Sequence, residues 1–134
     1  MRLFPGVRPP KLGAKDGKLA PAPRSPNAVS SQADPQRDAG HHIAPFGCNG
    51  NPDDTWRRLT ALVRALPGAE IVTADHHYLH AECGSMLLGF IDDFELLLDR
   101  AADLIHVRSA SRLGRRDFGV NRARVESLRA QLAH

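Results

Sequence analysis

The stretch that decides the fold is IHVRSASRLGRRDFGVN, from Ile105 to Asn121. Its first residues alternate apolar and polar side chains, as a strand does, and a polar turn then leads into a helix start. This stretch also holds the densest group of hydrogen-bonding side chains in the chain, and their spacing leads us to expect them in one small volume. They are Arg108, Ser109, Ser111, Arg112, Asp117 and Asn121. No catalytic signature lies among these residues, so the stretch predicts a polar hub rather than a reaction.

Four strands are predicted where the hydrophobic period is two, between Ala69 and Ser111. They are Glu70 to Asp75, His77 to Met86, Phe90 to Leu98 and Leu104 to Ser111. Their short connections permit only antiparallel neighbours.

A helix is predicted on each side of these strands. The first has Asn51 as its cap, Pro52 at its first position and an apolar stripe that ends before Pro67-Gly68. The last is predicted to begin at Asn121, which would cap the amide of Arg124, with Val120 and Val125 as a hydrophobic staple. This order predicts an α+β fold, a two-layer sandwich in which both helices cover one face of a four-stranded antiparallel sheet.

The first part of the chain differs in composition from the rest. Residues 1–52 hold nine of the ten prolines and six of the eleven glycines, and their apolar residues come singly or in short pairs. Such a segment cannot build its own core, so we expect an extended, basic wrapper on residues 53–134 within a single domain of residues 1–134.

Charge and cysteine usage narrow the class of protein. Residues 1–24 carry six basic residues against one acidic residue, a local charge of +5, although the whole chain has only +3. A basic segment of this kind on a near-neutral domain is usually solvated. We therefore do not expect nucleic acid as a partner. The absence of a long apolar run predicts a cytoplasmic protein that binds no membrane. Cys48 and Cys83 are expected to be free thiols, because no CxxC spacing is present.

Strand alternation sorts the polar residues between the two faces of the predicted sheet. His80 and Glu82 point to one face of the second strand, and His106 and Arg108 point to one face of the fourth. We expect these four side chains to share the face that the helices leave uncovered.

Several strings resemble one known family. They are SPNAVSSQ from Ser25, YLHAE from Tyr78, GFIDDFELLLD from Gly89 and IHVRSASRLGRRDFGVNRARVE from Ile105. Together they resemble the small bacterial and plastid proteins catalogued as domain of unknown function 1499, over nearly the whole chain. The resemblance implies no activity, but it makes the N-terminal half part of the domain. It also implies a departure, because relatives carry a cysteine pair where this chain has Ala22 and Ala28.

Catalytic and metal sites have weak support. His76, His77, His80 and Glu82 give two or three metal ligands at best. Asp92 and Asp93 point to opposite strand faces, so they cannot form a dyad. We expect one of them to be exposed and the other to accept hydrogen bonds from Arg108 or Arg112.

The hub itself has two interpretations. Its arginines and hydroxyls suit an anion, whereas Asp117 would instead complete a buried polar network. We therefore expect a non-enzymatic binding module for a small anionic ligand or a partner protein, with no metal and no cofactor. The alternative is a metal protein or cryptic enzyme that uses His80, Glu82 and His106. The sequence leaves the oligomeric state open.

Overall fold

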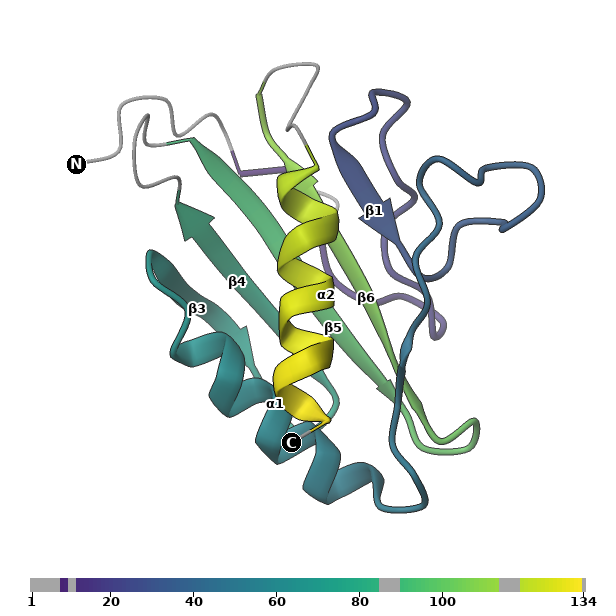
Figure 1. Ribbon diagram of the computed structural model, residues 1–134, viewed down its shortest axis with the longest axis vertical. Helices are drawn as coiled ribbons and strands as arrows, with labels where there is room; N and C mark the ends of the chain where they lie inside the picture. The colour runs from purple at the N-terminus through teal and green to yellow at the C-terminus, as the bar shows by residue number, and fades with distance from the viewer. Residues whose placement is uncertain (1–7, 10–11, 85–89, 114–118, 134) are drawn as a thin grey trace.

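The computed structural model describes residues 8–9, 12–84, 90–113 and 119–133, and it has an α+β fold (Figure 1). In chain order the elements are β1 (Ala28–Ser30), β2 (Phe46–Gly47), α1 (Pro52–Arg64), β3 (Ala69–Ala74), β4 (Tyr78–Gly84), β5 (Ile91–Asp99), β6 (Leu104–Ser111) and α2 (Val120–Leu132). Neither helix in the described part of the chain is long and apolar enough to cross a membrane.

One sheet has the strand order β1-β6-β5-β4-β3, and β2 also pairs with β6. The four predicted strands are present and pair antiparallel with their neighbours. The predicted strand number is wrong, because β1 and β2 bring the sheet to six strands. These two strands have three and two residues, which is too short for a readable hydrophobic period.

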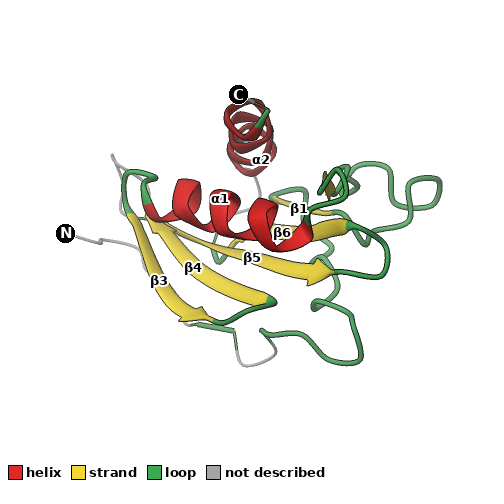
Figure 2. Ribbon diagram, turned by 90° about the horizontal axis from the view of Figure 1, so that it is seen from below, coloured by secondary structure: helices red, strands yellow, loops and turns green. Residues whose placement is uncertain are grey.

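The core lies between the sheet and the helices, both of which cover the same face (Figure 2). Strand alternation turns Leu79, Phe94 and Val107 toward this side, where they join one buried cluster with residues of both helices. The helix residues in that cluster are Trp56, Leu59 and Val63 of α1 and Val125 and Leu128 of α2. Cys48 and Cys83 also lie in this cluster as free thiols, as predicted.

The predictions for the first residues of the two helices have different outcomes. Asn51 accepts a hydrogen bond from the amide of Asp54 at 3.2 Å, so the predicted cap of α1 is confirmed. The predicted cap of α2 is wrong, because α2 begins at Val120 after Gly119, whose φ is +77°. Val120 is 48% exposed, which argues against the predicted hydrophobic staple.

The described part of the N-terminal segment contacts both faces of the sheet. β1 pairs with β6 at one edge and places Val29 in the core. Leu19 packs on the opposite face with Tyr78 and Leu97. That residues 1–52 form one wrapper, and that the chain is one domain, stay predictions.

Candidate functional site

The strand register places buried charged side chains on the helix-free face of the sheet. Glu82 pairs with Asp93, and Glu95 pairs with both His80 and Arg108, so these five residues share one face. His106 pairs with Leu97 on the same face, which confirms that His80, Glu82, His106 and Arg108 lie together on one side.

The predicted hub does not form one volume, because adjacent strand residues point to opposite faces. Arg108 and Arg112 contact carboxylates of the helix-free face. The hydroxyls of Ser109 and Ser111 instead contact Asn121 on the helix side. The sixth predicted member, Asp117, lies outside the described residues.

The helix-side cluster is a saturated polar network. Asn121 is fully buried, accepts from Ser109 Oγ at 2.5 Å and donates to Ser111 Oγ at 2.9 Å and to the carbonyl of Asn27 at 3.0 Å. Arg124 donates to Asn121 Oδ1 at 2.9 Å and to Asp92 Oδ2 at 2.7 Å. These groups satisfy one another, so the cluster joins α2, β6 and the residue before β1.

On the other face, Arg112 binds two buried carboxylates. Its Nε lies 2.7 Å from Asp93 Oδ2 and its Nη2 lies 2.8 Å from Asp93 Oδ1, while Nη2 also donates to Glu82 Oε2. His80 Nε2 lies 2.8 Å from Asp93 Oδ1. Burial would raise the pKa of Asp93, but hydrogen bonds from Arg112 and His80 lower it below its usual value.

Of Asp92 and Asp93, it is Asp93 that accepts hydrogen bonds from an arginine. This confirms one half of the prediction that we made for the two aspartates. Asp92 is not exposed as predicted, because Arg124 covers it on the helix side. The hydrogen bonds that Arg112 donates to Asp93 and Glu82 raise the pKa of Arg112, so its guanidinium stays charged.

A second carboxylate group lies beside the first. Glu95 Oε2 accepts hydrogen bonds from the Tyr78 hydroxyl and from the amide of Gly13, the latter at 2.9 Å. Arg108 Nη1 lies 3.5 Å from Glu95 Oε1. Among the described residues, Arg108 Nε and Glu95 Oε1 have no hydrogen-bond partner. Burial and the adjacent Glu95 raise the pKa of Tyr78 well above its usual value.

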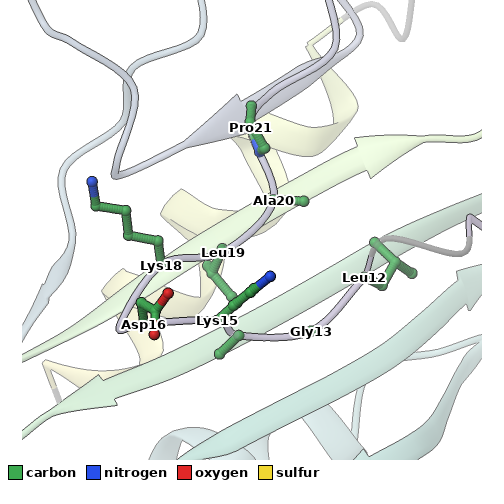
Figure 3. Close-up of a pocket in the computed structure, with 9 residues that line it drawn as sticks. Leu12, Gly13, Lys15, Asp16, Lys18, Leu19, Ala20 and Pro21 are labelled. Carbon is green, nitrogen blue, oxygen red and sulfur yellow. The ribbon is translucent and has the colours of Figure 1, made fainter.

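Residues 8–21, the arm, supply partners to this face. Arg8 Nε lies 2.7 Å from Glu82 Oε2, and Arg108 Nη2 donates to the carbonyl of Pro21 at 3.2 Å. Mainly through the Arg8 hydrogen bond, and also through Arg112, the pKa of Glu82 falls to about 2. Figure 3 shows Leu12 to Pro21 crossing in front of the strands.

A hollow of about 860 Å³ lies within the arm, lined by nine residues between Leu12 and Pro21 (Figure 3). All of its lining belongs to this one loop, and Glu82, Asp93 and Glu95 do not line it. The buried charged side chains therefore do not line the hollow, although Gly13 and Pro21, which do, contact Glu95 and Arg108 through their main chain.

The trio of His80, Glu82 and His106, which the alternative of a metal protein or cryptic enzyme requires, is not assembled among the described residues. The ligand atoms of His80 and Glu82 lie within 4.8 Å of those of Asp93 instead. His106 Nδ1 lies 3.1 Å from Ser31 Oγ, and burial lowers the pKa of His106. Because Arg112 occupies oxygens of both carboxylates, a cation at this place would meet a fixed positive charge.

Sequence reasoning left four contributors to the face out of the candidate site residues, namely Glu95, Tyr78, Arg8 and Gly13, although alternation places Tyr78 on the same face as His80 and Glu82. Alternation along GFIDDFELLLD did contain a signal for Glu95, which stands two residues after Asp93 and so shares its face. The arm residues carried no such signal, because a segment without periodicity does not indicate where it lies.

A family model described as a protein of unknown function, DUF1499, matches residues 18–132. The chain belongs to the DUF1499 family. No curated protein and no solved structure matches it. The DUF1499 match includes Glu82, Asp93, Glu95 and Arg108 but begins after Arg8 and Gly13. The carboxylates thus lie in the matched region, and two of their arm partners lie outside it.

Proposed function

We propose that the protein is a non-enzymatic binding module whose helix-free sheet face binds an extended basic segment of a partner protein. One observation carries this proposal. The buried carboxylates Glu82 and Glu95 accept an arginine side chain and a backbone amide from the arm, which are the groups that an extended basic peptide presents.

The charge of the face favours a cationic ligand over an anionic one. Glu82, Asp93 and Glu95 supply three negative charges, and the two buried arginines supply two positive charges. Arg112 is bound to two of the carboxylates, and an anion at Arg108 would lie against Glu95. A small anionic ligand, the other ligand class that the sequence favoured, would therefore be repelled by these carboxylates. A guanidinium at Glu82 is repelled by Arg112, but its hydrogen bond and attraction to Glu82 outweigh this repulsion, so the pKa of Arg8 is raised above its usual value.

Two of the arm's contacts use the main chain rather than a side chain. Gly13 contributes its amide to Glu95, and Pro21 contributes its carbonyl to Arg108. Main-chain contacts of this kind provide affinity for many sequences, while a single charged contact and an apolar pocket provide selection. We propose that Glu82 selects arginine, and that residues 8–21 of the predicted wrapper cover the face in the absence of a partner.

A peptide titration tests the proposed function. The full chain carrying Arg8→Gln, which lacks the guanidinium at Glu82, is titrated with a synthetic peptide of residues 7–21, and amide shifts are followed by NMR. We expect saturable shifts centred on Glu82 and Glu95. The matched control peptide has glutamine in place of its single arginine and should bind about tenfold more weakly, because a hydrogen bond between charged groups is lost.

Two outcomes would contradict the proposal. One is equal binding of the arginine and glutamine peptides, since Glu82 would then not select the ligand. The other is that inorganic phosphate, and not the peptide, shifts the residues around Arg108 and Arg112, which would favour the anionic ligand class.

A further inference from the structure

We infer that the arm is an intramolecular competitor, which occupies the proposed peptide site and must leave before a partner segment can bind there. This inference rests on the proposed function, because it concerns the same face. The arm contacts three neighbouring strands in turn, through Glu82 of β4, Glu95 of β5 and Arg108 of β6. A partner segment that uses the same acceptors cannot bind beside the arm.

The contacts differ along the arm, which makes its release from one end feasible. At the start, the Arg8 side chain is 54% exposed although its partner Glu82 is buried. Further along, Leu19 is buried with Tyr78 and Leu97, and its amide donates to Gln32 Oε1 at 2.8 Å. Exposed ion pairs contribute less than buried apolar contacts, so we expect the Arg8 end to be released first.

The arm also has the composition of a tethered ligand. It is basic, and Gly13 has a φ of +113°, a backbone conformation that residues with a Cβ rarely adopt. Its contacts define a pattern of an arginine, a glycine five residues later and a leucine six residues after that. We expect partner segments to follow the same pattern, because the acceptors, and the apolar side chains of Tyr78 and Leu97 that contact Leu19, lie at fixed positions in the sheet.

A tethered ligand competes at a high effective concentration, so it lowers the apparent affinity of the site for every free ligand. The arm lies partly outside the DUF1499 match, whereas all three acceptors lie inside it.

The test compares the affinity of one probe, the synthetic peptide of residues 7–21, for four full-length chains. These are the unaltered chain and its Arg8→Gln, Arg8→Glu and Arg24→Gln variants. We expect the peptide to bind Arg8→Gln about tenfold more tightly than the unaltered chain, and Arg8→Glu more tightly still, because glutamate is repelled by Glu82. Arg24→Gln removes an equal charge from an exposed residue near the arm and should bind like the unaltered chain.

Amide exchange in the unaltered chain gives a second readout. Saturating peptide should remove the protection of the Gly13 amide while the amides of β5 stay protected. Equal affinity of the peptide for the unaltered chain and Arg8→Gln, or a Gly13 amide that stays protected at saturation, would overturn the inference and leave the proposed function standing. Absence of peptide binding to all four chains would overturn both.

Discussion

Arg112 shows how a single residue distinguishes a structural network from an open ligand site. Its side chain is 5% exposed and lies between Asp93 and Glu82. Arg112→Ala leaves two buried carboxylates without this partner, so we expect a loss of about 3 to 5 kcal/mol in the free energy of unfolding. Urea unfolding measures it.

The matched control is Arg37→Ala, which removes an exposed arginine and should change the free energy of unfolding by less than about 0.5 kcal/mol. An Arg112→Ala variant as stable as this control would mean that the carboxylates do not need Arg112. That outcome would favour the anionic ligand class, contrary to the proposed function.

Asn121 was expected to cap α2 and instead bridges three parts of the chain. Its amide contacts Ser109, Ser111 and Asn27, all of which lose a buried partner in Asn121→Ala. We expect a loss of about 3 kcal/mol, since buried polar groups without partners cost about 1 to 3 kcal/mol each. Asn51→Ala, which removes a true helix cap, should cost about 1 kcal/mol. Thermal or urea unfolding of both variants measures these losses. Equal losses of unfolding free energy in the two variants would argue against the bridging role of Asn121.

At the scale of elements, hydrophobic periodicity predicted the helices and the four long strands but missed the two short strands. The stripe of Trp56, Leu59 and Val63 predicted α1, and alternation predicted the four long strands. β1 has only three residues, and its place beside β6 depends on pairing with residues about eighty positions away. Such long-range pairing leaves no local trace, which is why the strand number was underestimated.

The turn between α1 and β3 depends on one glycine. Gly68 has a φ of +78°, and a Cβ there would lie 2.8 Å from the carbonyl oxygen of Gly84 in β4. Gly68→Ala should therefore lower the free energy of unfolding by more than about 1 kcal/mol, through both backbone strain and this clash. Gly40→Ala is the matched control, because a Cβ there meets nothing within 4 Å. Equal melting temperatures of the two variants would contradict the prediction.

At the scale of the whole molecule, the candidate site was predictable only where it lies on regular strands. Alternation along the sequence was enough to place His80, Glu82, His106 and Arg108 on one face, and the strand register confirms it. The same rule, applied to the hub, would have separated Arg108 from Ser109. The arm could not be placed, because its contacts are single polar bonds from a segment without a pattern.

The stability of the whole chain should depend on pH through His41, which contacts Asp38 in its own turn and the backbone of Ser25. Its Nδ1 lies 2.7 Å from Asp38 Oδ1 and its Nε2 lies 2.7 Å from the carbonyl oxygen of Ser25. Both partners are acceptors, so both ring nitrogens donate only when the imidazole is protonated. The hydrogen bond to Ser25, and then Asp38, raise the pKa of His41 above its usual value of 6.5.

A raised pKa contributes stability that is fully present below the unfolded value of about 6.5 and is lost as the pH rises through the folded pKa. The unaltered chain should therefore lose more stability than His41→Gln as the pH rises above about 6.5, measured by urea unfolding. His106→Gln is the control, because burial lowers the pKa of His106 and places its effect below pH 6.5. If His41→Gln and the unaltered chain have parallel profiles above pH 6.5, then the His41 imidazole is neutral in the folded protein and one of its two contacts is not a hydrogen bond.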